Sequence, residues 1–296
     1  MQSTTEQNSE PEASQKVSRQ WYGSVGLRVV TSVVAIPFVL IFVWFGGWWA
    51  FAAVLFIVAI ATYELHMMML HSGHHPLMLV SLALSTLFLV SAMLPSLQVR
   101  LLLLEVGFGM ALLISFLWLF LRRNLDGALV DWALTLSFSI YLGWPMSFIL
   151  LLRGYQVGWP LPRGTWWVLA ALIGVWSFDS AAFFAGRFFG RHKLAPSISP
   201  GKTWEGVVGG LICSIIVSLL VTVGPLGIAW YMAALLGILI GIAAVLGDLA
   251  ESLIKRQTHV KDSGQIMPGH GGILDRIDSM LFVLIVVYLF VQFIGL

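Results

Sequence analysis

Charged residues are scarce in this chain. Lys, Arg, Asp and Glu make up 10% of the 296 residues, whereas hydrophobic residues make up 59%. Soluble domains carry about 25% charged and about 45–50% apolar residues. The composition therefore excludes an ordinary soluble domain and indicates a protein that crosses a membrane several times.

Cysteine is almost absent. The one cysteine, Cys213, excludes an internal disulfide and any metal site built from cysteines. It lies in a long apolar run, where we expect a small buried apolar residue. Residues 1–22 lack such a run, so we expect a disordered polar tail rather than a cleaved signal peptide.

Long apolar runs, by contrast, are abundant. A spanning helix needs about 20 mainly apolar residues, and nine stretches qualify: 27–45, 47–65, 77–94, 101–121, 132–152, 166–185, 206–223, 228–247 and 279–295. We therefore expect an all-α polytopic membrane protein with about nine transmembrane helices. After the tail, it divides into helices 1–5 (23–165) and helices 6–9 (166–296), which include polar loops at 186–205 and 248–278.

Lys and Arg are few but unevenly placed. With nine spans, 13 of the 16 fall on the side of the N-terminus and 3 on the other side. Because cytoplasmic loops of membrane proteins are enriched in Lys and Arg, we expect the N-terminus in the cytoplasm and the C-terminus on the opposite side. The two polar loops then face the cytoplasm.

Acidic residues gather around these loops. At the end of the eighth span, helical spacing places four polar residues on one face: Asp248, Glu251, Ser252 and Lys255. The alternative is a solvated, salt-bridged helix end. Asp275 and Asp278 begin the last span, so we expect Asp248, Asp275 and Asp278 to share one pocket. Three clustered carboxylates need a cation, and oxygen ligands favour Mg²⁺, which completes its shell with substrate phosphates.

Groups suited to phosphate lie between those helix ends. Lys261, His270 and Arg276 are donors for phosphate oxygens. The glycines of residues 269–272, GHGG, can turn backbone N–H groups toward an anion. The alternative for these glycines is a plain turn.

The 186–205 loop carries four cations. Its Gly-Lys-Thr is not a P-loop, because Pro196 stands where that motif requires its first glycine. We expect residues 200–203 to be a loop entering the next helix, with Thr203 as the N-cap. The alternative is a basic loop that contacts anionic lipid headgroups.

Asp179 lies deep in the sixth span. Ionisable groups inside membrane helices usually face a polar site; the alternative is a salt bridge to Arg187 on the same helix face. Together, a metal site and phosphate donors without a protein nucleophile predict phosphoryl or nucleotidyl transfer. A site at the membrane implies that one substrate is a lipid.

The sequence SLIKRQTHVKDSGQIMPGHGGILDRID, residues 252–278, resembles the C-terminal signature of phosphatidate cytidylyltransferases (CDP-diacylglycerol synthases). Thirteen residues are in register: Ser252, Lys255, Arg256, Lys261, Asp262, Gly264, Pro268, His270, Gly271, Gly272, Asp275, Arg276 and Asp278. Met267 stands where Leu, Ile or Phe is usual. Residues 176–210 resemble the family's second segment, with Gly201 where many members have Lys. The N-terminal half matches in outline, at Arg28 and Glu64.

The resemblance implies that CTP and phosphatidic acid give CDP-diacylglycerol and pyrophosphate. It implies Mg²⁺, and allows a second metal ion, on Asp248, Asp275 and Asp278, which with Lys255 form the catalytic set. The substrate-binding residues it implies are Ser252, Arg256, Lys261, Asp262, His270, Gly271, Gly272 and Arg276, then Ser199, Lys202, Thr203 and Glu205 on the nucleotide side, and Asp179 and Arg187.

We therefore expect CTP or dCTP and phosphatidic acid as partners and no nucleic acid. A homodimer is compatible with the sequence. The expected location is a bacterial inner membrane, with the active site facing the cytoplasm. Two rival functions remain: a CTP-dependent lipid kinase, and a transporter that uses intramembrane acids. The His- and Met-rich residues 66–75 predict an interfacial helix end with a turn at Ser72–Gly73, with copper binding as the alternative.

Overall fold

The computed structural model describes residues 37–154, 161–266 and 271–295. After a helical stretch at 37–45, the helices are α2 (Gly47–His71), α3 (Met78–Met93), α4 (Leu97–Phe120), α5 (Ala128–Phe138), the π-helix η1 (Ser139–Gly143), α6 (Trp144–Arg153), α7 (Arg163–Phe189), α8 (Trp204–Leu226), α9 (Trp230–Gln257) and α10 (Leu274–Phe293). Two short strands, β1 (Lys193–Ala195) and β2 (Ser199–Thr203), form an antiparallel hairpin.

The predicted helical membrane fold is confirmed in outline. Six helical segments of the described chain are long and apolar enough to cross a membrane: α2, α4, the continuous run from α5 through α6, α7, α8 and α9. α3 is apolar but shorter. The count of nine spans and the orientation of the termini stay predictions, and the predicted tail at 1–22 lies outside the described residues.

One local expectation is wrong. Residues 200–203 were expected as a loop but belong to β2, so the fold is not purely helical. The backbone groups of the segment between α7 and α8 bond to each other, as when Trp204 N–H donates to the His192 carbonyl at 3.0 Å. α9 continues to Gln257, in agreement with the helical spacing expected for Asp248 to Lys255.

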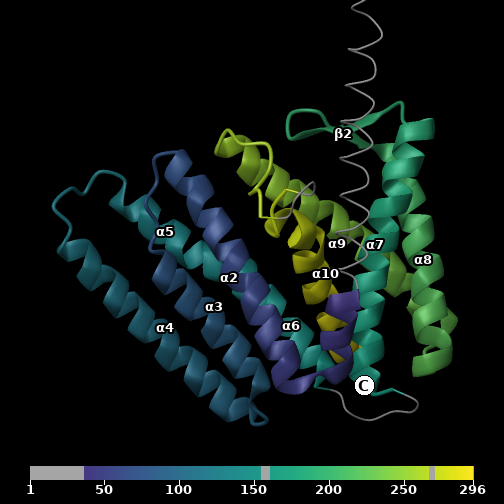
Figure 1. The fold of residues 1–296 in the computed structure, drawn as a ribbon. Helices are drawn as coiled ribbons and strands as arrows, with labels where there is room; N and C mark the ends of the chain where they lie inside the picture. Colours follow the sequence, from purple (N-terminus) through teal and green to yellow (C-terminus); the bar gives the residue numbers. More distant parts are fainter. Residues whose placement is uncertain (1–36, 155–160, 267–270, 296) are drawn as a thin grey trace, which may run out of the picture.

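α10 lies between two groups of helices. Figure 1 shows α2–α6 on one side and α7 and α8 on the other, with α9 running diagonally across beside α10, and α10 contacts α2, α6, α7 and α9. Its side chains Leu274, Leu281, Leu284 and Val287 are fully buried. The N-terminus of α10, where Asp275 and Asp278 lie, is therefore held by both groups.

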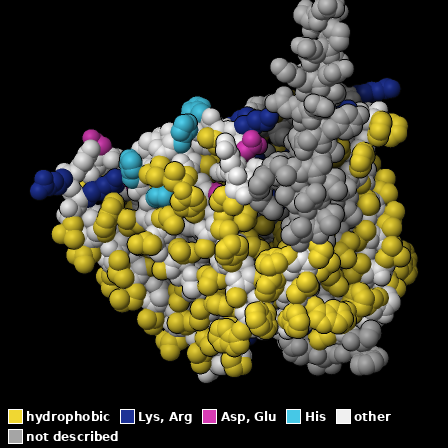
Figure 2. All heavy atoms as spheres, in the orientation of Figure 1, with side chains coloured by type: hydrophobic (Ala, Val, Ile, Leu, Met, Phe, Trp, Pro, Cys, Tyr) yellow, Lys and Arg dark blue, Asp and Glu magenta, His cyan; other side chains and the backbone are white. Residues whose placement is uncertain are grey.

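Polar residues collect at one end of the molecule. Figure 2 shows Lys, Arg, Asp, Glu and His side chains along the upper edge of this face, above a mainly hydrophobic surface. In Figure 1 the hairpin and the turn after α9 lie at that same upper end. Since a bilayer core disfavours charged groups, this end fits the polar side of a membrane protein.

Small residues let the membrane helices approach closely. A Cβ added to Gly237 of α9 would lie 2.5 Å from the Cα of Ile215 in α8. At the same crossing the Ser214 hydroxyl donates to the Gly237 carbonyl at 2.9 Å. Such small-residue contacts are typical of helix packing in lipid. Cys213 beside them is half-buried, whereas the sequence predicted a buried residue.

The His- and Met-rich stretch ends α2 as predicted. α2 stops at His71, and the turn at Ser72–Gly73 is confirmed, with Gly73 at φ +84°. Beyond it, the backbone N–H of His75 donates to Asp131 at 2.7 Å, and Arg122 forms an ion pair with the same carboxylate at 2.7 Å. These contacts tie the end of α2 to α5.

Candidate active site

A glycine allows α9 and α10 to touch where the acidic residues lie. A Cβ added to Gly247 would lie 2.5 Å from the Asp278 carbonyl oxygen and 2.9 Å from the Cα of Ser279. No side chain fits there without moving backbone. The contact brings the part of α9 that carries Asp248 against the part of α10 that carries Asp278, and the two carboxylates interact electrostatically.

The hairpin packs onto the same face of α9. Lys202 of β2 forms a 2.8 Å ion pair with Asp248, and the Ser252 hydroxyl donates to the other Asp248 oxygen at 3.3 Å. One turn further, Arg256 donates from Nε to the Ile198 carbonyl at 3.1 Å. The structure thus joins the two polar segments that the sequence analysis treated separately.

Lys255 connects two acids from different helices. Its Nζ lies 2.7 Å from Oδ1 of Asp275 and 2.5 Å from Oε2 of Glu251. Glu251 is fully buried, and within the described chain its carboxylate has this ion pair but no hydrogen bond. An ion pair inside a low-dielectric region is costly to break by removing one partner, so Lys255 fixes α9 against the start of α10.

The second oxygen of Asp275 also has partners. It accepts from the Ser263 N–H at 3.0 Å, from the Ser263 hydroxyl at 2.9 Å and from the Gly272 N–H at 2.8 Å. A Cβ on Gly272 would overlap Ser263 and Glu64. The predicted phosphate-binding N–H of Gly272 is therefore used by a carboxylate of the chain itself. His270 lies outside the described residues.

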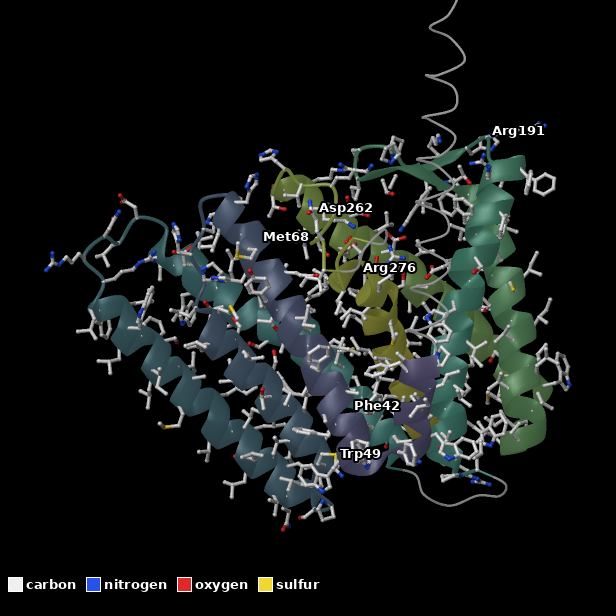
Figure 3. All side chains as sticks on the ribbon, viewed as in Figure 1. Phe42, Trp49, Met68, Arg191, Asp262 and Arg276 are labelled. Carbon is white, nitrogen blue, oxygen red and sulfur yellow. The ribbon has the colours of Figure 1, made fainter. Side chains whose placement is uncertain are left out.

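The remaining predicted residues surround this cluster. Asp179 of α7 is exposed beside it and interacts electrostatically with Asp278, Asp248, Lys202 and Arg276. In the described chain no ion pair joins Asp179 to Arg187, whose side chain is exposed. Figure 3 shows Arg276 and Asp262 in this upper central region, with Arg191 toward the hairpin.

Six further predicted residues of the polar segments lie within the described chain. Thr203 is the N-cap of α8, as predicted, and accepts from the Gly206 N–H at 3.1 Å. Glu205 binds His192 through a 2.7 Å contact to its ring Nδ1, so this carboxylate stabilises the hairpin. Ser199 is half-buried in β2, and Lys261, Asp262 and Gly271 follow α9, the first two exposed.

The family of the chain follows from comparison with known proteins. The model of the cytidylyltransferase family matches residues 26–294, which is more than half of the chain. The chain belongs to the cytidylyltransferase family.

Curated relatives in this family share one name. A phosphatidate cytidylyltransferase of Synechocystis sp. is 34% identical over 298 residues, covering 89% of this chain and 95% of the relative. One of Staphylococcus saprophyticus is 50% identical over 123 residues (41% of this chain, 47% of the relative). One of Haemophilus influenzae is 46% identical over 125 residues (40% and 43%). The chain matches less than half the length of the latter two relatives.

Three residues at this site were not among the predicted site residues, although Glu64 was named as a match to the outline of the family. Glu64 of α2 is buried and bonds to Ser263 and to the start of α10. Its place inside an apolar span was the available indication, because intramembrane acids usually have a partner. Ser263 lies within the family signature. The Tyr141 hydroxyl of η1 is buried, has no hydrogen bond within the described chain and interacts electrostatically with Glu251, Asp278 and Asp248; no sequence pattern points to it.

The site fits the divalent cation that the resemblance implies. Asp248 and Asp278 offer carboxylate oxygens from two helices, and neighbouring like charges favour a cation between them. Mg²⁺ is commonly bound by one or two carboxylates together with waters and substrate phosphates. Among the residues described, no three His, Cys, Asp or Glu side chains are grouped as a metal site. The two carboxylates thus fit Mg²⁺ held jointly with a phosphorylated substrate.

The contacts of Asp275 predict a stability effect. Asp275→Asn removes the charge that pairs with Lys255. It also places an amide NH₂ group either against the Lys255 ammonium or against the donors of Ser263 and Gly272. We expect the free energy of unfolding to fall by about 1–3 kcal/mol, because buried donors lose a charged acceptor, while Lys255 keeps its ion pair with Glu251. Thermal unfolding of the detergent-solubilised protein measures this. Asp262→Asn, which alters an exposed side chain, is the control; equal unfolding temperatures for both variants contradict the prediction.

Proposed function

We propose that this chain transfers the cytidylyl group of CTP to phosphatidic acid, giving CDP-diacylglycerol and pyrophosphate. One observation carries the proposal: Lys255, Asp275 and Asp278 of the family signature meet Asp248 and Lys202 in one cluster at the polar end of the helices. The Synechocystis relative, named a phosphatidate cytidylyltransferase, aligns over 89% of the chain and supports it.

The reaction needs no nucleophile from the protein, because the lipid phosphate is itself the nucleophile. A phosphate oxygen of phosphatidic acid attacks the α-phosphorus of CTP, a new P–O bond forms, and the bond between the α-phosphorus and the bridging oxygen breaks. Pyrophosphate leaves with that electron pair. The lipid phosphate is already an anion, so no strong base is required. The barrier is the repulsion between phosphates and the charge that grows on the leaving group.

The chain supplies positive charge and position for this step. We propose that Lys202 and Arg276 contact phosphate oxygens, since both interact electrostatically with Asp179 at the same site. Phosphate contacts of Lys255, Arg256 and Lys261 stay predictions. Asp248 and Asp278 would hold Mg²⁺, which when bound stabilises the charge on the departing pyrophosphate. Asp275 as a third ligand stays a prediction, as does a second metal ion.

The proposal includes a topology. Nine spans, a cytoplasmic N-terminus and a cytoplasmic active site in a bacterial inner membrane fit the position of the hairpin and the turn after α9 at one end (Figure 1). They also fit the basic residues counted on that side. Use of dCTP and formation of a homodimer stay predictions.

Labelled CTP tests the function. Purified protein in mixed micelles receives phosphatidic acid, Mg²⁺ and CTP labelled either at the α- or at the γ-phosphate. Transfer of the α-label to lipid, with release of pyrophosphate, is the expected result. Transfer of the γ-label to a lipid alcohol indicates instead a CTP-dependent lipid kinase. No transfer of either label to any lipid contradicts both enzymes and favours the transporter.

A further inference from the structure

Glu64 is a buried acid whose hydrogen-bond donors, among the residues the structure describes, come from the C-terminal part of the sequence. It lies in α2 with 2% of its surface exposed. Oε1 accepts from the Ile273 N–H at 2.9 Å, and Oε2 accepts from the Leu274 N–H at 2.8 Å. Oε2 also lies 3.2 Å from the Ser263 hydroxyl, whose single hydrogen Glu64 shares with Asp275. These donors lie 199 to 210 residues away along the chain.

The first turn of α10 depends on this carboxylate. The first N–H groups of a helix have no partner within the helix, and the N-cap residue Ile273 has no side chain that can accept. Glu64 supplies the missing acceptor from another helix. Its negative charge also lies at the positive end of the helix dipole of α10. No Lys, Arg or His in the described ranges forms an ion pair with Glu64.

Glu64 is also linked to the acids of the site. The Ser263 hydroxyl lies 3.2 Å from Glu64 and 2.9 Å from Asp275, and Asp275 in turn pairs with Lys255. Glycine is required beside this group, because a Cβ on Gly264 would lie 2.6 Å from Oε1 of Glu64. A continuous set of contacts therefore runs from α2 to α9.

We infer that Glu64 is a positioning residue for cytidylyl transfer. From the N-terminal helices it fixes the start of α10, and thereby the placement of Asp275 and Asp278 against Asp248. It contacts neither substrate in this role. The inference rests on the proposed function, and it assigns to α2 a part in a site otherwise built from η1, α7–α10 and the hairpin.

The first test separates turnover from substrate binding. Glu64→Gln keeps the size of the side chain but sets an NH₂ group against one of the backbone donors. We expect kcat to fall about 10- to 100-fold, the range typical when a residue that orients a ligand is changed, while KM for CTP and for phosphatidic acid stays within about threefold. Glu105→Gln, which alters an exposed acid of α4 remote from this cluster, is the matched control and should keep wild-type kcat.

Chemical rescue gives a result that general destabilisation does not. Glu64→Ala leaves the two N–H groups of α10 facing a space of carboxylate size. Formate, a small carboxylate, should raise kcat of Glu64→Ala at least about fivefold, and leave the wild type and Glu105→Ala unchanged. Hydrogen exchange should also be faster at residues 271–275 in Glu64→Ala, and unchanged in α8.

The outcomes are distinct. Lack of α-label transfer by the wild type refutes the proposed function, whereas the exchange measurement still tests the cap. Wild-type kcat in both Glu64 variants overturns the inference. So does a loss of kcat without formate rescue and without faster exchange at 271–275, because the start of α10 would then be held without Glu64. Slower turnover with rescue and local exchange supports it.

Discussion

Asp278→Asn is expected to lower kcat for cytidylyl transfer about a hundredfold to a thousandfold, the loss seen when a charge-stabilising group is removed from an active site. The substitution keeps the shape of the side chain. Oδ1 of Asp278 accepts from the Ser279 N–H at 2.7 Å, and an asparagine oxygen can accept the same bond. The negative charge is lost, and with it one of the two carboxylates proposed to hold Mg²⁺.

The stability of this variant should be close to wild type. Unlike Asp275, Asp278 forms no ion pair within the described residues that the substitution would break, so the thermal unfolding temperature should change little. Titration of activity with Mg²⁺ should show a higher requirement than wild type. Asp126→Asn, in the exposed turn before α5, removes one negative charge elsewhere and should keep full activity. Wild-type kcat and Mg²⁺ requirement in Asp278→Asn would remove Asp278 from the metal site.

The sequence was most informative about the helices and about one face of α9. Apolar runs predict spanning helices because every backbone group in lipid must be bonded within the segment. The spacing of Asp248, Ser252 and Lys255 predicts a shared face, because the helical period is fixed. Both predictions rest on local geometry, and the structure has both features.

Features that depend on distant partners were not predictable. The hairpin consists of strands of three and five residues, too short to show a periodic pattern. Nothing near Glu64 in the sequence indicates that its donors are Ile273 and Leu274. The glycines of the signature were expected to bind phosphate, yet the Gly272 N–H binds Asp275. Backbone N–H groups in a turn can bind any suitable anion. Here they bind two carboxylates of the chain itself, those of Asp275 and Glu64.

The second large effect on kcat is expected at Gly247, the glycine at the contact between the segments that carry Asp248 and Asp278. Gly247→Ala introduces a methyl group 2.5 Å from the Asp278 carbonyl oxygen. This neighbour is backbone, so the contact cannot be relieved by rotating a side chain, and α9 and α10 must separate. We expect kcat to fall at least about a hundredfold, because a shift of about 1 Å in a catalytic group can cost that factor. Overpacking should also lower the free energy of unfolding by about 1–3 kcal/mol.

Two glycines of neighbouring helices separate the effect on the site from the effect on packing. Gly224→Ala in α8 meets nothing within 4 Å and should leave both kcat and unfolding unchanged. Gly237→Ala crowds the Ile215 backbone at 2.5 Å, away from the acids, and should destabilise the protein while the folded fraction keeps most of its kcat. If Gly247→Ala and Gly237→Ala lose kcat equally, the α9–α10 contact matters only for packing. If Gly247→Ala alone loses it, the spacing between Asp248 and Asp278 sets the rate.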